Sequence, residues 1–274
     1  MSKTKKLKSI LGMLALSTMG ACSSEADAKP EGQDVSKKEE KTAKVSNKVC
    51  QPTLMEVEAK GKKQTTNLFY TANQLDSLVV SATGRPEKIV IRYSYNEKKQ
   101  LTQIDMKGEK DDYVYENDLI KRIESGQLAT VFDYNEKNQL VSLKEQTKGH
   151  TTSEYKYEYD QNGAPIKRNF YNAKGELVVE VTYEYDSMKN PYVGLGRKTN
   201  LMEAMNGYPV GNYKHNVLKA TQTVHKKSFF IEGKPGDVIV SEFKHTYDES
   251  GYPTTFLNQF FGQSIPTSIQ YKCD

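Results

Sequence analysis

Three aspartates recur at equivalent places in this sequence and could support acid–base chemistry. Asp160, Asp186 and Asp248 each directly follow a tyrosine. A glycoside hydrolase uses a pair of carboxylates that flank the scissile bond. However, each of these aspartates occupies the same place in a repeated unit, where its side chain can bond to nearby backbone and start a turn. We therefore predict that they cap turns, and hydrolysis of a glycan is the least favoured hypothesis.

The histidines do not form a metal-binding pattern. They are His150, His215, His225 and His245, and none belongs to an H-E-x-x-H motif or to a close cluster with cysteine. Three lie within residues 215–245, which leaves a loose metal site as an alternative, but neighbouring lysines would repel a cation. The sequence also lacks a G-x-S-x-G serine motif. We predict no enzymatic activity, no metal and no cofactor.

Cys22, the first of three cysteines, stands at the end of a secretory signal. Four lysines precede an uncharged apolar run, ILGMLALSTMGA at residues 10–21, which is the arrangement of a signal peptide. The run is shorter than the ~20 residues needed to span a bilayer. The residues MGA before Cys22 resemble a bacterial lipobox, whose cysteine receives a diacylglyceryl group. We predict a lipoprotein signal peptide at 1–21 and lipidation of Cys22, with plain secretory cleavage as the alternative.

Lipidation of Cys22 would place the protein on a membrane of the cell envelope. Acyl chains contribute ~0.8 kcal/mol per buried CH₂, so two or three chains hold a folded domain at a bilayer. Ser23 after the cysteine resembles the outer-membrane sorting signal more than the signal for inner-membrane retention. We expect an outer-membrane lipoprotein, on the periplasmic or the surface side, whose first partner is the membrane through its N-terminal lipid.

Residues 22–48 have the composition of a lipidated, disordered tether. Residues 23–48 carry six acids and six lysines, no aromatic residue and two valines, too little apolar surface to offset the entropy of ordering. A coil of this length reaches about 28 Å; a binding motif within it is the alternative. Four of the 39 basic residues lie in the predicted signal, which leaves 35 basic against 35 acidic residues. We therefore predict no nucleic-acid partner.

The other two cysteines, Cys50 and Cys273, lie at the two ends of the remaining chain. In an oxidising compartment of the envelope a pair of cysteines favours a disulfide. Such a bridge would close a very long loop and stabilise the fold by at most ~5 kcal/mol in the chain-entropy model. We predict a Cys50–Cys273 disulfide, with two free thiols or a catalytic cysteine as the alternatives.

A twelve-residue phrase, YSYNEKKQLTQI at 93–104, returns as FDYNEKNQLVSL at 132–143. Tyr95, Tyr115 and Tyr134 are 20 and 19 residues apart, and such a period is typical of a repeat architecture. In each unit Tyr-x-Tyr alternates as in a half-buried strand, an Asn or Asp starts a turn, and a second alternating run follows. Each unit is therefore predicted to be one β-hairpin, and successive hairpins should pair into an antiparallel meander.

The strands predicted from this pattern have one apolar face and one polar face. Ile89, Ile91, Tyr93 and Tyr95 share a face, whereas the residues between them are mainly polar. A membrane barrel would show an apolar band on its outer face, so we predict a soluble sheet around its own core. The chain has 18 tyrosines and no tryptophan, and we expect the tyrosines in this core with their hydroxyls at its rim. A ligand-stacking surface is the alternative.

The interval of about 187–240 interrupts the repeat. Asn200 and Glu203 have the spacing of a capping box, which predicts a short helix near 200–205. An insertion in a repeat array often carries specificity, and a lid or plug at one end of the sheet is an equal alternative. The residues of this insertion that we consider ligand-facing are Tyr192, Tyr208, Tyr213, His215 and His225.

The sequence also resembles known families. The units YEYDQNGAP (157–165) and TYDESGYP (246–253) resemble the YD repeats of Rhs-type cell-surface proteins. Residues 50–274 as a whole resemble a family of envelope lipoproteins of unknown function with a porin-like fold, through the lipobox, the repeated tyrosine turns, YEYDSMKNPYVGL (183–195), NYKHNVLKA (212–220) and IQYKC (269–273). The resemblance implies the fold class and an envelope location, and it implies no enzymatic activity.

These features predict a single all-β domain at 49–274. It should be an antiparallel meander of repeated hairpins, curled into a barrel-like or sandwich-like sheet with a short helical insertion. The leading hypothesis for function is a non-enzymatic, lipid-anchored scaffold that binds a protein or an envelope glycan through one rim and residues 187–236. The alternative is a carrier that holds a lipid or a small apolar ligand inside the curled sheet.

Overall fold

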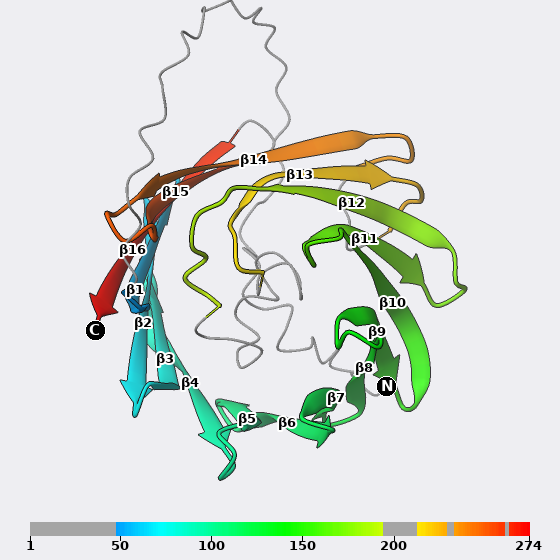
Figure 1. Cartoon of the computed structure of the whole chain (residues 1–274), viewed down its shortest axis with the longest axis horizontal. Helices are drawn as coiled ribbons and strands as arrows, with labels where there is room; N and C mark the ends of the chain where they lie inside the picture. The colour runs from blue at the N-terminus through cyan, green and yellow to red at the C-terminus, as the bar shows by residue number, and fades with distance from the viewer. Residues whose placement is uncertain (1–47, 194–212, 229–232, 261–262) are drawn as a thin grey trace, which may run out of the picture.

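The chain forms a closed antiparallel barrel of sixteen strands in the computed structural model (Figure 1). The structure describes residues 48–193, 213–228, 233–260 and 263–274. Each strand pairs with the next along the chain, and β1 pairs with β16 to close the barrel. The all-β prediction is confirmed, and closure selects the barrel over the sandwich. The helix predicted near 200–205 lies outside the described residues.

The strands follow one another with short connections, except between β12 and β13 and between β13 and β14. The first eight are β1 (Cys50–Ala59), β2 (Lys62–Thr71), β3 (Gln74–Ala82), β4 (Arg85–Tyr95), β5 (Leu101–Met106), β6 (Glu109–Glu116), β7 (Leu119–Ser125) and β8 (Leu128–Tyr134). The second eight are β9 (Leu140–Thr147), β10 (His150–Tyr159), β11 (Pro165–Asn172), β12 (Leu177–Tyr185), β13 (Val217–Val224), β14 (Val238–Tyr247), β15 (Pro253–Phe260) and β16 (Gln263–Cys273). The predicted insertion at about 187–240 thus contains β13 and the first residues of β14, which are strands of the barrel wall.

The two ends of the barrel differ in their tyrosines, although two-residue turns with positive φ at both residues occur at both ends, as at Ala72-Asn73. Each even-numbered strand has a tyrosine at or near its last residue, and all of these strands end at the same rim of the barrel. We call this end the tyrosine rim. At the opposite end, tight turns such as Lys60-Gly61, Lys107-Gly108 and Lys148-Gly149 have positive φ at both residues, as a two-residue hairpin turn requires. We call this end the glycine rim. The first strand begins at Cys50 and the last strand ends at Cys273. Both of these chain ends lie at the tyrosine rim.

A β-bulge accompanies the tyrosine at the end of each even-numbered strand. For example, Tyr95 is opposite Leu101, whereas the preceding Ser94 is opposite Gln103, so one residue of β5 is left unpaired. The same shift occurs beside Tyr70, Tyr115, Tyr134, Tyr159, Tyr185, Tyr247 and Tyr271. A bulge bends its strand and increases the local twist. The repeated phrase therefore supplies a repeated bend, and the bends curl the meander toward closure.

The tyrosines at this rim hold neighbouring strands together through their hydroxyl groups. The Tyr95 hydroxyl donates to the carbonyl of Leu75 at 2.6 Å, and the Tyr134 hydroxyl donates to that of Ile120 at 2.9 Å. The same contact joins Tyr70 to Pro52, Tyr159 to Leu140, Tyr185 to Pro165 and Tyr271 to Pro253. Each bond links the end of an even-numbered strand to the start of the strand before it. We call these bonds tyrosine latches; they confirm the prediction of core tyrosines with hydroxyls at the rim.

Substitution of Tyr134 by phenylalanine is expected to lower the free energy of unfolding by about 1 to 2 kcal/mol, because the carbonyl of Ile120 loses its partner in a partly buried place. Urea unfolding of the two proteins measures the difference. Tyr171→Phe is the control, because Tyr171 lies on the outer face with the Lys156 ammonium 5.1 Å from its ring centre. An equal loss in both variants would contradict the latch.

The inner face of the barrel is apolar and aromatic. Leu78, Leu101 and Phe132 are almost fully buried there, and they belong to a continuous cluster that runs from β1 across β10 and includes β16. A smaller cluster covers β12 and β13 and packs against Phe243 of β14. Burial of each large side chain contributes roughly 1.5 to 3 kcal/mol. The predicted aromatic core is therefore the inner face of a barrel.

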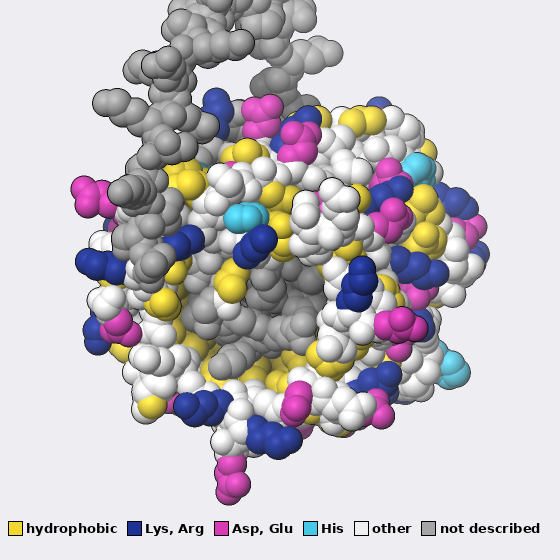
Figure 2. Space-filling view, in the orientation of Figure 1, with side chains coloured by type: hydrophobic (Ala, Val, Ile, Leu, Met, Phe, Trp, Pro, Cys, Tyr) yellow, Lys and Arg dark blue, Asp and Glu magenta, His cyan; other side chains and the backbone are white. Residues whose placement is uncertain are grey.

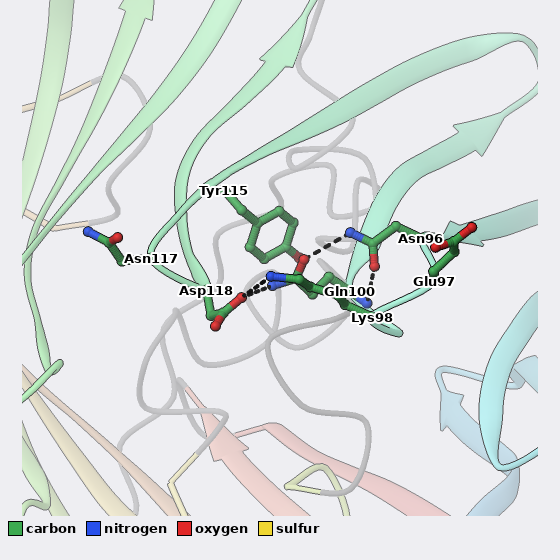
Figure 3. A pocket seen from close by; sticks show the side chains of 7 residues that line it. All are labelled: Asn96, Glu97, Lys98, Gln100, Tyr115, Asn117 and Asp118. Atoms are coloured by element: carbon green, nitrogen blue, oxygen red, sulfur yellow. Dashed lines mark hydrogen bonds and ion pairs between the residues drawn. The ribbon is translucent and has the colours of Figure 1, made fainter.

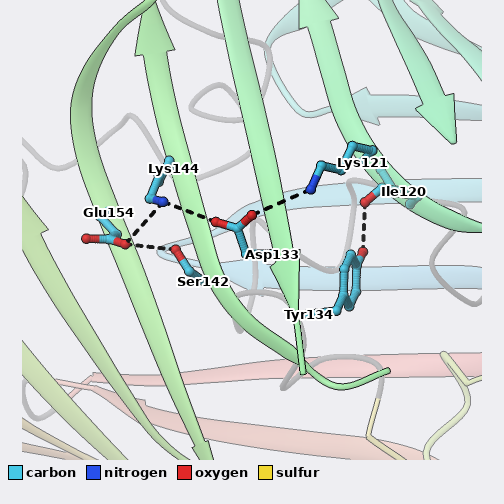
Figure 4. A network of polar contacts seen from close by, with 7 residues as sticks. All are labelled: Ile120, Lys121, Asp133, Tyr134, Ser142, Lys144 and Glu154. Atoms are coloured by element: carbon cyan, nitrogen blue, oxygen red, sulfur yellow. Dashed lines mark hydrogen bonds and ion pairs between the residues drawn. The ribbon is translucent and has the colours of Figure 1, made fainter. Parts of the chain in front are cut away.

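The outer face carries ion pairs that cross several strands. Asp133 on β8 lies between Lys121 on β7 and Lys144 on β9, at 3.6 and 3.1 Å, and Lys144 also lies 3.9 Å from Glu154 on β10 (Figure 4). Such charges favour contact with water over contact with lipid chains. This agrees with the prediction that the sheet has a polar outer face. Within the described ranges, no helix has the length and hydropathy of a membrane span.

The predicted disulfide is confirmed. Cys50 and Cys273 form a disulfide bond, with their Cα atoms 4.1 Å apart and a sequence separation of 223 positions. The two residues are opposite each other at the end of the β1–β16 ladder. The bond therefore lies across the seam where the barrel closes.

Candidate functional site

The aspartates at the tyrosine rim cap turns, as predicted. The Asp160 carboxylate accepts hydrogen bonds from the amides of Asn162 and Ala164, both at 2.8 Å. Asp248 does the same for Ser250 and Tyr252. In the earlier units Asn96 and Asn135 accept the equivalent bonds through their amide oxygens. Because the turn needs only an oxygen acceptor, asparagine can replace aspartate there, which accounts for the Asn residues of the repeated phrase.

Asp186 has a larger role than the other rim aspartates. Its carboxylate accepts from the amides of Met188 and Asn216, both at 3.0 Å, from the Asn216 side chain at 3.1 Å, and from the hydroxyl of Tyr247. Burial and this bond to Asp186 raise the pKa of Tyr247. Tyr247 thus bonds to the carboxylate instead of forming a latch to a strand. We call this cluster the Asp186 anchor, and it joins the end of β12 to the start of β13.

The described parts of the β12–β13 connection lie against each other at this rim. Asn190 donates from its backbone to Lys214 at 3.0 Å and from its side chain to the carbonyl of Tyr213 at 2.8 Å. His215 bonds through Nδ1 to the carbonyl of Met188 at 3.0 Å. Tyr192 is buried in the main core, where its hydroxyl lies 3.6 Å from Met55 Sδ on β1. The connection therefore reaches from β12 to the inner face of β1.

The five residues considered ligand-facing are not all in one place. Tyr192, Tyr213 and His215 gather near the Asp186 anchor, where the Tyr213 ring packs against Tyr185 and His215. His225 is exposed after the end of β13 at the glycine rim, and its amide donates to Val178. Tyr208 lies outside the described residues. Figure 2 shows hydrophobic side chains around the middle of the view with some Lys or Arg side chains among them, and most of the charged side chains toward the periphery.

An open recess lies between two neighbouring turns of the tyrosine rim (Figure 3). It has a volume of about 720 Å³ and is lined by Asn96, Glu97, Lys98, Gln100, Tyr115, Asn117 and Asp118. Gln100 lies at its centre: its side chain donates to Asp118 at 2.9 Å and accepts from Asn96 at 2.8 Å. Lys98 lies 3.4 Å from the same Asp118 oxygen. We call this feature the rim recess.

The rim recess was not predicted as a site, although four of its seven lining residues belong to the repeated phrase. The phrase identified the turn at 96–100 but not its neighbour at 117–118, which comes from another unit. Within the described ranges, no three His, Cys, Asp or Glu side chains are close enough to hold a metal ion. The polar side chains that line the recess can exchange hydrogen bonds with a ligand. The ring of Tyr115, which also lines it, can contact an apolar surface of that ligand.

A family model described as the teneurin YD-shell matches residues 33–192, more than half of the chain. No curated protein matches the chain. Among solved structures, the chain is similar to a porin-like protein from Bacteroides uniformis, with a TM-score of 0.56 and 12% sequence identity, covering 84% of this chain and 99% of that chain. The family match and this structure confirm the predicted YD-repeat, porin-like β fold.

Two further solved structures are more distant. A porin-like protein from Bacteroides vulgatus is 10% identical, with a TM-score of 0.43, and the match covers 81% of this chain and 98% of that chain. The Tc holotoxin pore of Photorhabdus luminescens is 14% identical, with a TM-score of 0.29, and the match covers 76% of this chain and 9% of that chain.

Proposed function

Because the chain belongs to the teneurin YD-shell family and its fold is a closed β shell, we propose that it is a non-enzymatic scaffold of the cell envelope that binds a glycan at the rim recess. The observation that carries this proposal is the lining of the recess. Amide, carboxylate and ammonium groups converge there beside one tyrosine ring. A few placed polar groups with an aromatic wall can orient a ligand rich in hydroxyl groups.

The contacts within the rim recess support a rigid polar site. Asn96, Gln100 and Asp118 hold one another by hydrogen bonds, so their free lone pairs and protons have defined directions. A preformed arrangement reduces the entropy lost on binding. The cores of protein–protein interfaces are instead enriched in aromatic residues and depleted in charged ones. The recess is mainly polar and charged, so it fits a glycan better than a protein.

The proposal includes anchoring through a lipid on Cys22 at the outer membrane. The barrel begins at Cys50, so the predicted tether of residues 22–48 would join it at the tyrosine rim. A coil of that length reaches about 28 Å. The rim recess lies at the same end of the barrel and would stay near the membrane surface and the glycans attached there. Metabolic labelling with a palmitate analogue, compared between the wild type and Cys22→Ala, tests the anchor.

Substitution of Gln100 by alanine is expected to weaken glycan binding about 10-fold, since the variant loses both side-chain bonds that orient Asn96 and Asp118. Binding is measured by calorimetry against polysaccharide purified from the producing cell's own envelope. Gln139→Ala is the matched control, because Gln139 has the same place in the repeated phrase, bonded to Asn135 at 2.9 Å, and does not line the rim recess.

Two results would contradict the glycan proposal. One is equal binding by the Gln100 and Gln139 variants. The other is that the protein binds no polysaccharide, while a photoreactive amino acid placed at position 97 crosslinks to a protein partner. The second result would leave the scaffold role in place and change the class of its partner.

A carrier of a lipid or a small apolar ligand is the second candidate function. The observation that favours it is the apolar inner face of a closed barrel, since barrels of sufficient size enclose ligands. Native mass spectrometry of the protein purified from its own envelope distinguishes the two functions. An adduct of a few hundred daltons supports the carrier, and a bare mass contradicts it.

A further inference from the structure

The inner face of the barrel carries a cation that has no counterion among the described residues. Arg168 on β11 is opposite Tyr157 on β10 and Val181 on β12. Both of these residues are buried in the clusters of the inner face. Arg168 therefore points inward. The preceding Lys167 points outward, where its ammonium lies 2.6 Å from Glu180.

An aromatic ring of the inner face lies beside the Arg168 guanidinium. Its central carbon lies 5.8 Å from the ring centre of Tyr155, which itself packs on Phe170 at 4.9 Å. Among the residues that the structure describes, Arg168 forms no ion pair and no hydrogen bond. Glu145 lies on the same face, but its carboxylate accepts a hydrogen bond from Ser153. The cation–π contact with Tyr155 compensates only part of the hydration that a partly buried guanidinium loses.

A hydrogen-bond donor without a partner lies close to this cation. Tyr183 is two residues beyond Val181, the residue opposite Arg168, and its side chain is 8% exposed. The hydroxyl has no partner among the described residues. The register of β11 and β12 makes Tyr183 a diagonal neighbour of Arg168 on the same inner face. Burial raises the pKa of Tyr183, and the positive charge of Arg168 opposes this shift. Buried polar groups are normally hydrogen-bonded, and two neighbouring donors that have no acceptor among the described residues could together hold one anionic group.

We propose that Arg168 and Tyr183 form a binding site for the carboxylate of an amphipathic guest on the inner wall of the barrel. A guanidinium binds a carboxylate through two parallel hydrogen bonds, and the Tyr183 hydroxyl can supply a third. One cation balances one negative charge. The partly exposed ring of Phe170, two residues along β11 on the same face, offers apolar surface beside it for the body of the guest. This site is distinct from the rim recess, and it goes beyond the proposed glycan-binding function.

The test compares oleate with methyl oleate, which has the same chain and no charge, by calorimetry on the delipidated mature protein. The wild type is expected to bind oleate at least 10-fold more tightly than methyl oleate. Arg168→Met should weaken oleate binding at least 30-fold and Tyr183→Phe about 5-fold, with little change for methyl oleate. Arg122→Met is the control, because Arg122 lies on the outer face 2.8 Å from Glu124, and it should bind oleate as the wild type does.

The thermal stability of the ligand-free protein provides a second readout. Removing an uncompensated buried charge by an apolar side chain of similar size favours the folded state, so Arg168→Met is expected to raise Tm while it abolishes oleate binding. A lower Tm would show that the guanidinium has a partner within the chain and would overturn the proposal. Equal affinity of the wild type for oleate and methyl oleate, or no binding of oleate, would also overturn it.

The Gln100→Ala variant separates this proposal from the glycan proposal. Its oleate affinity is expected to equal that of the wild type, because the rim recess lies on the turns after β4 and β6 and Arg168 lies on β11. A parallel loss of oleate and polysaccharide binding in this variant would contradict two independent sites.

Discussion

Replacement of Cys50 and Cys273 by serine is expected to lower the free energy of unfolding by about 3 to 5 kcal/mol, one of the two largest effects that we predict. The bond links residues 223 positions apart, and it therefore removes a large amount of conformational freedom from the unfolded chain. It also lies across the ladder that joins the first and last strands of the barrel, β1 and β16. Equilibrium urea unfolding of the double variant and the oxidised wild type measures the loss.

Reduced wild-type protein is the control for the serine substitutions. If the bond acts by restricting the unfolded chain, the reduced protein and the double variant should have the same midpoint. The urea dependence should also become steeper without the bond, because the unfolded chain then exposes more surface. A loss below about 1 kcal/mol with no change in this slope would show that the β1–β16 ladder closes the barrel without help from the disulfide.

Substitution of Asp186 by alanine is expected to lower the free energy of unfolding by about 3 to 5 kcal/mol. The carboxylate accepts from two backbone amides, the Asn216 side chain and the Tyr247 hydroxyl. Hydrogen bonds to a charged group contribute about 1.5 to 3 kcal/mol each, and their losses are not fully additive. Asn216 is also buried, so its side chain would be left without a good acceptor.

Asp160→Ala is the matched control for Asp186→Ala. Asp160 has the same place in the repeat, but its carboxylate accepts from only two backbone amides of its own turn. We expect a loss of about 1 kcal/mol there. Hydrogen exchange should also become faster at the Met188 and Asn216 amides in Asp186→Ala and stay unchanged in Asp160→Ala. Equal losses in the two variants would mean that Asp186 only caps a turn.

The turns and strands could be predicted from the sequence because their causes are local. Tyr95 and Asn96 are adjacent, and the turn that Asn96 caps closes at Gln100, four residues later. The alternation of Ile91, Tyr93 and Tyr95 likewise depends on neighbours two residues away. The terminal disulfide could be predicted because Cys50 and Cys273 allow a single pairing once Cys22 is assigned to the predicted signal, and the expected envelope location favours oxidation.

The sites could not be predicted in the same way. The rim recess joins Gln100 to Asp118 from the turn of another unit, and no pattern within one unit shows that contact. Arg168 stands in the run Ile166-Lys167-Arg168-Asn169, in which Lys167 and Arg168 look equally exposed. The pairing of β10, β11 and β12 decides that Lys167 faces outward and Arg168 inward, since a shift of one residue would exchange the two faces.

The local pattern of residues thus accounts for the hairpins, the tyrosines of the inner face, the capped turns and the cysteines at the seam. Closure into a sixteen-stranded barrel rather than a sandwich, the joining of Asp186 to Asn216 and Tyr247, and the inward position of Arg168 follow from contacts between distant strands. The physical reason is that bends and twists accumulate over the whole sheet. The position at which the first strand meets the last depends on all of them together and on no single unit.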